Sequence, residues 1–299
     1  MQQPLYAIVG PTASGKSDLA VALAHALDGE VVSADSMQIY QGLDIGSAKV
    51  TAAEMDGVPH HLLDFLPPEA AYNAALFQRD ALAAILCGGT GLYVNAVLYP
   101  MDFTGASHDP AVRQALEARL AAEGPEALHA ALRAVDPTSA GRLTPSNTRR
   151  VIRALEVHAL TGRPMSSFDS DSYQSRAFRF TPTFCFGLDW PRDVLEARIR
   201  LRVRRMLEGG LLEEVQALRA RGLTSAHQSM QGLGYKEILA YLEGEGTLAQ
   251  AEEAICVHTR QFAKRQMTWF RREKRILWLP GGQPGAVDVC LRHIRMASP

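Results

Sequence analysis

Short apolar runs alternate with amphipathic stretches near both ends of the chain, which is the pattern of a parallel α/β fold. "LYAIVG" (residues 5–10) predicts a buried strand, residues 17–27 an amphipathic helix, and "EVVSAD" (residues 30–35) a second strand. Later in the chain, "FTPTFCFGLDW" (residues 180–190) and "RILWLP" (residues 275–280) predict further strands. We therefore expect a parallel sheet core flanked by helices.

Helical periodicity dominates the middle of the chain. Residues from about 109 to 140 predict two amphipathic helices that separate at Gly124 and Pro125, and a capped helix follows that ends at Gly162. These helices interrupt the strand pattern. We therefore expect a helical insertion domain at residues 106–168 within a catalytic core formed by residues 1–105 and 169–299.

The composition indicates the general class of protein but does not point to a reaction or a ligand. The chain has 299 residues, 47% of them hydrophobic and 21% charged, as in an ordinary globular protein. The net charge is −1, so any surface that binds a polyanion must be local. Cys87, Cys185, Cys256 and Cys290 lack CxxC spacing, which indicates reduced thiols. With no leader pattern and no apolar run long enough for a bilayer, we expect a cytoplasmic protein without a membrane partner, and a monomer.

The stretch "GPTASGKS" has the G-x-x-x-x-G-K-S spacing of a P-loop, between a predicted strand and a predicted helix. In that context the backbone amides and the helix N-terminus cradle phosphates, and the lysine adds a positive charge. The Ser17 hydroxyl is the expected ligand of a Mg²⁺ ion, which we expect as the cofactor. The motif predicts a diphosphate site without saying what the diphosphate carries. The predicted binding residues are Gly10, Pro11, Thr12, Ala13, Ser14, Gly15, Lys16 and Ser17.

Two polar residues follow predicted strands at the same sheet edge as the P-loop. Asp35 ends the second strand, where it is a magnesium ligand, a general base or an N-cap, and its position favours a catalytic role. Thr90 stands among glycines in "CGGTGLY", a turn between a strand and a helix. Such a turn is often only tight geometry, but its place at this edge makes Thr90 a candidate hydroxyl contact.

Basic residues gather in two helical segments. In "TRRVIRALEV" the spacing puts Arg149 and Arg153 on one helix face, with Arg150 beside them. "TRQFAKRQMTWFRREKR" (residues 259–275) mixes basic and aromatic side chains. Charge runs are usually solvated faces, yet two of them in a near-neutral chain favour a local phosphate-binding surface.

Taken together, these segments resemble the tRNA dimethylallyltransferases, also called tRNA isopentenyltransferases. The resemblance runs nearly end to end through "GPTASGKS", "SADSMQIYQGLDIGSAK", "GVPHHLLD", "FQRDAL", "GGTGLY", "TRRVIRALEV", "GYKE" and "TRQFAKRQMTWFR". It implies a P-loop NTPase-like core. It also implies transfer of a dimethylallyl group from dimethylallyl diphosphate to N6 of adenosine 37, in the anticodon stem-loop of tRNA.

The resemblance also assigns roles to single residues. It implies that Asp35 is the general base, that Thr90 lies near donor and tRNA, and that Arg260 lies near the diphosphate. Ser17 stands where the family often has Thr, and both residues have a hydroxyl group. The residues for which it implies tRNA contact are Asp35, Ser36, Met37, Gln38, Thr90, Arg113, Arg149, Arg150, Val151, Ile152 and Arg153.

Three other functions share some of these features. A P-loop kinase of a nucleotide or small alcohol has the same loop, Mg²⁺ and fold class. An isopentenyltransferase acting on free AMP or ADP uses the same donor, although it needs no extended cationic surface. A P-loop RNA-binding protein without catalysis is the third, and Asp35 beside the loop argues against it.

One segment departs from the family pattern. Between "FQRDAL" and "GGTGLY" the family has a helix end, a turn and a buried strand, whereas this chain has only "AAILC". A helix over residues 73–85 runs roughly 20 Å away from the phosphate loop, and two residues cannot return the chain to Thr90. We therefore expect either a lost central strand or, preferably, residues missing from the sequence between Ala83 and Leu86.

Overall fold

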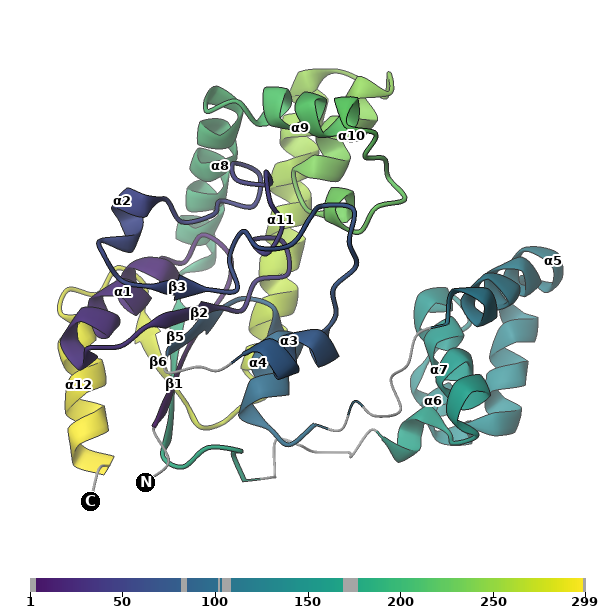
Figure 1. The fold of residues 1–299 in the computed structure, drawn as a ribbon, viewed down its shortest axis with the longest axis horizontal. Coiled ribbons are helices and arrows are strands. Elements are labelled where there is room, and N and C mark those ends of the chain that lie inside the picture. The colour runs from purple at the N-terminus through teal and green to yellow at the C-terminus, as the bar shows by residue number, and fades with distance from the viewer. Residues whose placement is uncertain (1–3, 82–84, 102, 104–108, 169–176, 298–299) are drawn as a thin grey trace. The chain divides into compact units, whose positions relative to one another are not determined.

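A six-stranded parallel sheet organises the larger part of the chain (Figure 1). The computed structural model describes residues 4–81, 85–101, 103, 109–168 and 177–297. Within these residues the strands lie in the order β3-β2-β4-β1-β5-β6. They are β1 (Leu5–Val9), β2 (Val31–Ser33), β3 (His60–His61), β4 (Ile85–Gly88), β5 (Thr183–Asp189) and β6 (Ile276–Pro280). The expected parallel sheet, P-loop core and helical flanks are confirmed.

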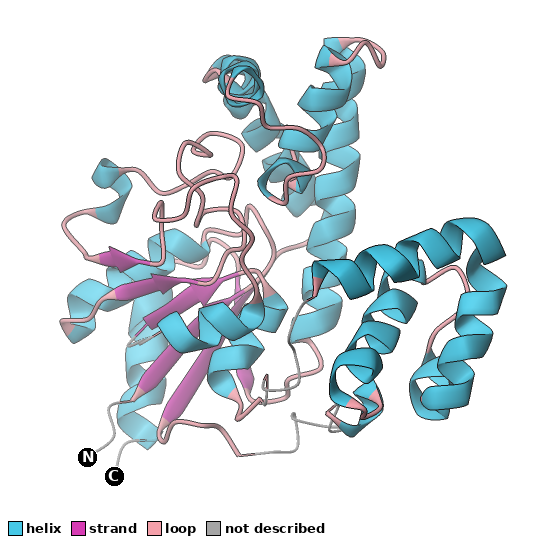
Figure 2. Cartoon of the chain, turned by 45° about the vertical axis from the view of Figure 1, so that its right-hand side comes forward, coloured by secondary structure: helices cyan, strands magenta, loops and turns pink. Residues whose placement is uncertain are grey.

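Helices cover both faces of this sheet (Figure 2). On one face α1 (Lys16–Leu27) and α12 (Ala286–Ala297) bury apolar side chains such as Leu23 and Ile294 against the strands. On the other side lie α3 (Ala74–Asp80) and α4 (Gly91–Leu98). The strands carry almost continuous apolar runs, as expected of strands buried on both faces. The remaining helices of this part are α2 (Ala52–Met55), α8 (Arg192–Glu208), α9 (Leu211–Ala220), α10 (Tyr235–Leu242) and α11 (Leu248–Phe270), with a 3₁₀ turn at Ser229–Gln231.

The described chain divides into two compact units, one formed by residues 1–98 and 178–299 and the other by residues 99–177. The second unit contains α5 (Pro110–Val135), α6 (Pro137–Arg142), α7 (Thr148–Thr161) and a 3₁₀ turn at Met165–Ser167. Its helix α5 is kinked at Gly124, where the backbone leaves the helical region. An apolar core that includes Leu128, Leu132 and Leu155 holds the unit together.

The predicted helix over residues 73–85 is wrong. Asn73 caps α3 by accepting hydrogen bonds from two backbone N–H groups, but the helix ends at Asp80. Ile85–Gly88 instead forms β4, which pairs with β1 on one side and β2 on the other. Burial of Ile85–Gly88 between two neighbouring strands favours the extended form, so the central strand is present. The bonds around Ala83 lie outside the described residues, and the expected gap there stays a prediction.

No helix among the described residues is both long enough and apolar enough to cross a membrane.

Candidate active site

The P-loop connects β1 to α1 at the carboxyl edge of the sheet. Gly15 has a φ of 87°, a left-handed conformation that a residue with a side chain rarely adopts. A Cβ on Gly10 would lie 3.1 Å from the Leu188 carbonyl oxygen, so the loop must pass close to β5. The Lys16 ammonium donates a hydrogen bond to the Pro11 carbonyl, at 2.9 Å. The loop therefore curls around its own lysine, with the amides at the start of α1 beside it.

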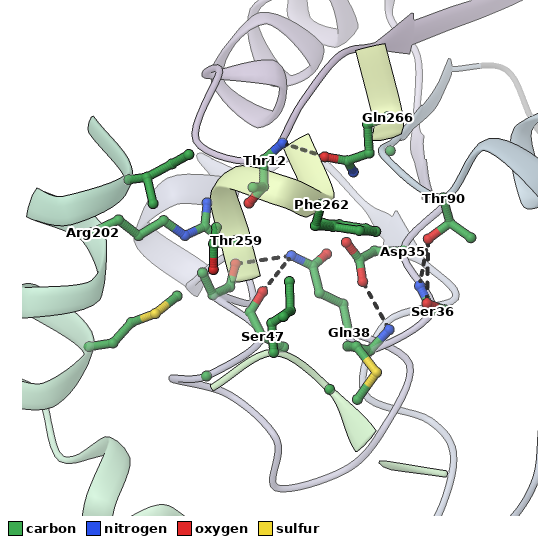
Figure 3. A pocket seen from close by; sticks show the side chains of 18 of the residues that line it. Thr12, Asp35, Ser36, Gln38, Ser47, Thr90, Arg202, Thr259, Phe262 and Gln266 are labelled. Atoms are coloured by element: carbon green, nitrogen blue, oxygen red, sulfur yellow. Dashed lines mark hydrogen bonds between the residues drawn. The ribbon is translucent and has the colours of Figure 1, made fainter. Parts of the chain in front are cut away.

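A cavity of about 330 Å³ opens beside this loop (Figure 3). Its walls come from the P-loop, the segment after β2, the turn after β4, and the helices α8 and α11. Thr12, Lys16, Ser17, Asp35, Ser36, Met37, Gln38 and Thr90 all line it. The structure thus brings together the predicted general base, the predicted nucleotide-contacting segment and part of the predicted diphosphate loop.

Hydrogen bonds fix the Asp35 segment against the turn that carries Thr90. The backbone N–H of Ser36 donates to Thr90 Oγ1 at 3.1 Å, and the Thr90 N–H donates to the Ala34 carbonyl at 3.1 Å. One Asp35 carboxylate oxygen accepts the Met37 N–H at 2.9 Å and so stabilises the turn at residues 36–39, where no helix begins. The other oxygen has no hydrogen-bond partner among the described residues. The turn contact therefore leaves one Asp35 oxygen available for base chemistry.

Gln38 has a fixed orientation in the cavity wall. Its amide nitrogen donates to the Ala48 carbonyl at 3.0 Å, and its amide oxygen accepts from the Ser33 hydroxyl at 3.0 Å. The loop that contains Ala48 is itself held by Glu214, whose carboxylate accepts three consecutive backbone N–H groups, at residues 44–46. The donor and acceptor that Gln38 presents to a ligand are thus set by the fold.

Lys16 and Arg202 line this cavity together with two further cations, Lys236 and Arg265, and with the Asp35 carboxylate. Desolvation lowers the pKa of Lys16, and it also lowers the pKa of Arg202 on α8. Within the described part of the chain, Arg202 makes no hydrogen bond and no ion pair. Unpaired cations that are partly withdrawn from water are poised to bind an anion. Sequence reasoning missed Arg202, although it interrupts the apolar face formed by Ile199, Val203 and Met206.

Arg260, in contrast, is not brought to the cavity. Its guanidinium pairs with Glu196 at 2.7 Å, and it does not line the cavity although Thr259, Phe262 and Gln266 of the same helix do. The helical spacing of α11 turns residue 260 toward α8 instead. The structure therefore gives no support to the expectation that Arg260 lies near the diphosphate, whereas Arg202 lines the cavity together with Lys16.

The expected tRNA-contact residues of the second unit fall into three groups. Arg149 and Arg150 are exposed on α7. Arg113 and Arg153 both pair with Glu156, which is fully buried, so part of their charge stabilises the unit itself. Val151 and Ile152 are 1% and 3% exposed, so their side chains pack in the apolar core of the unit, and the contact of this segment with tRNA stays a prediction.

The site offers a metal few protein ligands. Among the described residues no group of three or more His, Cys, Asp or Glu side chains is arranged to hold a metal ion. Ser17 lines the cavity, and a single hydroxyl suits Mg²⁺ that takes its other ligands from phosphates and water. Burial raises the pKa of the Cys87 thiol to about 11, so this cysteine is a neutral wall residue at pH 7.

Comparisons with known proteins agree with this geometry. Residues 38–273 match the family described as "IPP transferase", and residues 3–65 match "Isopentenyl transferase". The tRNA dimethylallyltransferase of Pelotomaculum thermopropionicum is 47% identical over 93% of this chain and 91% of its own length. That of Salinispora arenicola is 48% identical over 98% of this chain and 86% of its own.

Solved structures give the same result. The tRNA isopentenylpyrophosphate transferase of Bacillus halodurans superposes with a TM-score of 0.70 at 41% identity, covering 99% of this chain and 96% of that one. A eukaryotic dimethylallyltransferase acting on tRNA superposes with a TM-score of 0.80 at 27% identity, over 99% and 78%.

Proposed function

The chain belongs to the IPP transferase family, and we propose that it transfers a dimethylallyl group from dimethylallyl diphosphate to N6 of adenosine 37 in tRNA, releasing diphosphate. The observation that supports the proposal best is that one cavity brings the P-loop, Lys16 and Arg202 beside Asp35. A leaving diphosphate and an acceptor amine need these groups side by side.

The P-loop amides, Lys16 and Arg202 hold the donor diphosphate in this proposal. Their positive charge stabilises the negative charge that grows on the leaving group as its bond to carbon breaks. Mg²⁺ held through Ser17 adds to this stabilisation when it is bound. Apolar side chains of Ile199, Val203 and Ile255 line the same cavity and suit the hydrocarbon part of the donor.

Asp35 assists the acceptor. The lone pair of an exocyclic adenine amine is conjugated into the ring, so the amine becomes a good nucleophile only as its proton leaves. N6 forms a bond to C1 of the donor, the C1–O bond breaks, and diphosphate departs with the bonding electrons. The free Asp35 oxygen accepts the N6 proton, while the other oxygen keeps its bond to Met37. The adenine of adenosine 37 must leave the stacked anticodon loop to reach this oxygen.

The tRNA anticodon stem-loop is the proposed partner of the second unit. Arg149 and Arg150 are the exposed cations on α7, and they suit phosphate contacts, which position an RNA without reading its sequence. Arg113 and Arg153 contribute less, because Glu156 holds them. Gln38 and Thr90 lie at the cavity and suit contacts to the flipped nucleotide.

We further propose that the protein acts as a monomer in the cytoplasm, where unmodified tRNA is its substrate. All the residues assigned to the donor and to the reacting base come from one chain. Size-exclusion chromatography with light scattering, with and without tRNA, tests the oligomeric state: a dimer under both conditions would contradict this part of the proposal.

Product analysis tests the function itself. The protein is incubated with dimethylallyl diphosphate, Mg²⁺ and unmodified tRNA, and the digested nucleosides are identified by mass. We expect a dimethylallyl group on adenosine 37 and one diphosphate for each group transferred. Parallel reactions contain AMP or ADP as acceptor, or ATP as donor. Modified AMP with unmodified tRNA, or loss of the ATP γ-phosphate to an acceptor, would support one of the other functions instead.

A further inference from the structure

The side chain of Gln266 joins two loops of the active site. Gln266 lies on α11, far along the chain from both loops, and is 6% exposed. Its amide oxygen accepts the backbone N–H of Thr12 at 2.9 Å, and its amide nitrogen donates to the carbonyl of Gly89 at 2.9 Å. Figure 3 shows the Gln266 side chain beside Thr12, with the dashed line marking the hydrogen bond between them. One end of this amide therefore contacts the P-loop and the other the turn after β4.

The turn is shaped to accept this contact. A Cβ on Gly89 would lie 2.1 Å from the Gln266 amide nitrogen, and a Cβ on Gly91 would lie 2.4 Å from the Trp269 ring. The end of α11 thus packs directly on the turn backbone, and only glycine fits at either position. Since Thr12 offers a donor and Gly89 an acceptor, the orientation of the Gln266 amide is also determined.

The turn that Gln266 contacts is itself hydrogen-bonded to the segment that carries Asp35, the predicted general base. Thr90 follows Gly89, and its hydroxyl accepts the Ser36 N–H next to Asp35. One short path of hydrogen bonds therefore leads from the P-loop through Gln266 and Thr90 to the segment that carries Asp35.

We propose that Gln266 is a positioning residue, which sets the distance between the P-loop and the Thr90–Asp35 side of the cavity. The inference rests on the proposed function, in which the P-loop holds the leaving diphosphate and Asp35 assists the attacking amine. Both reactants bind without Gln266, but their reacting atoms are then misaligned. A misplacement of about 1 Å costs about 10²-fold in the rate of such a step.

Two substitutions and one control test this role. Gln266→Met keeps the length of the side chain and removes both hydrogen bonds. Gln261→Met makes the same change at an exposed position of the same helix and serves as the control. For Gln266→Met we expect a single-turnover transfer rate about 10²-fold lower, with dissociation constants for donor and tRNA within about threefold of the wild type. The control should match the wild type in all three.

Gln266→Glu separates positioning from general loosening of the fold. When the introduced carboxyl group is ionised, a negatively charged oxygen faces the oxygen of the Gly89 carbonyl and repels it. When the carboxyl group is protonated, it accepts a hydrogen bond from the Thr12 N–H and donates one to the Gly89 carbonyl, as the amide does. Its rate, divided by that of Gln266→Met at each pH, should therefore rise as the pH falls from about 8 to 6, since burial favours the protonated carboxyl. The other titratable or charged groups that line the cavity are the same in both variants, so the division removes their titration; they are Lys16, Asp35, Cys87, Arg202, Lys236 and Arg265.

The outcomes are distinct. An inactive wild type refutes the proposed function and with it this inference. With an active wild type, a normal rate in Gln266→Met, or a rate ratio for Gln266→Glu that does not change with pH, overturns the positioning role alone. If Gln266→Met does not fold, the pH profile of Gln266→Glu, taken relative to the wild type, decides in the same way.

Discussion

Removal of Arg202 is the most informative test of the donor site. The Arg202→Ala substitution takes away a guanidinium that has no partner among the described residues and that faces the same cavity as Lys16. Two unit charges about 4 Å apart interact by about 4 kcal/mol at an effective dielectric constant of about 20. Water that fills the space left by the Arg202 side chain solvates the diphosphate and so recovers part of this interaction energy. A loss of about 3 kcal/mol then corresponds to about 10²-fold in kcat/KM for dimethylallyl diphosphate.

The fold should not suffer from this change. Desolvation lowers the pKa of Arg202, which means that its charge is destabilised in the unliganded protein. Arg202→Ala should therefore unfold at a temperature equal to or above that of the wild type, while it binds donor more weakly. Arg202→Lys should recover part of the loss, because it keeps the charge but not the planar fork.

Arg204→Ala, an exposed arginine on the same helix, is the matched control. Donor affinity is measured by calorimetry and the rate by single-turnover transfer. Wild-type donor affinity and rate in Arg202→Ala, or an equal loss in Arg204→Ala, would refute the assignment.

Three further predictions concern the second unit. Arg149→Ala should weaken tRNA binding and reduce the slope of the logarithm of the tRNA binding constant against the logarithm of the salt concentration by about 1, without a change in stability. Arg153→Ala should instead destabilise the unit by about 1 to 3 kcal/mol, because it removes a partner of the buried Glu156. Filter binding at several salt concentrations and thermal unfolding separate the two, and equal effects on stability would contradict them. Burial would raise the pKa of Asp136, but hydrogen bonds from Ser139 and Ser166 outweigh it and lower the pKa to about 2. Asp136 therefore stabilises the unit above about pH 4 and loses this contribution, about 2 kcal/mol, as the pH falls toward 2. Hydrogen-exchange protection of α7 should decline over that pH range. A decline of the same size in Asp136→Asn would show the reasoning to be wrong.

The parts of the site that could be predicted from sequence are local in the chain. The P-loop has a spacing that depends on backbone requirements at Gly10 and Gly15, and Asp35 follows a strand whose end must lie at the same edge. Each needs only one strand and the turn after it. For this reason the sequence was sufficient to place them together.

The residues contributed by α8 and α11 were missed for the opposite reason. Arg202 and Gln266 reach the cavity only because two long helices pack beside the sheet edge, and no local motif encodes that packing. A weaker signal was present, since Gln266 is a polar residue between the buried side chains of Ala263, Met267 and Phe270. A polar residue on an apolar helix face has to find a buried hydrogen-bond partner.

One error arose where a pattern was followed too far. The helix over residues 73–85 followed the alanines, whereas the apolar "ILC" before two glycines was the signal for β4. Pairing with two neighbouring strands decided the structure there.

The central claim is that Asp35 accepts the N6 proton while the P-loop side holds the leaving diphosphate. The most direct measurement is a single-turnover reaction of Asp35→Asn with dimethylallyl diphosphate and an unmodified anticodon stem-loop. Adenosine 37 modification and diphosphate release are followed together. We predict a rate at least about 10²-fold below that of the wild type, with donor and RNA affinities unchanged and one diphosphate released for each modified adenosine. A rate near that of the wild type, or diphosphate released without modification of adenosine 37, would contradict it.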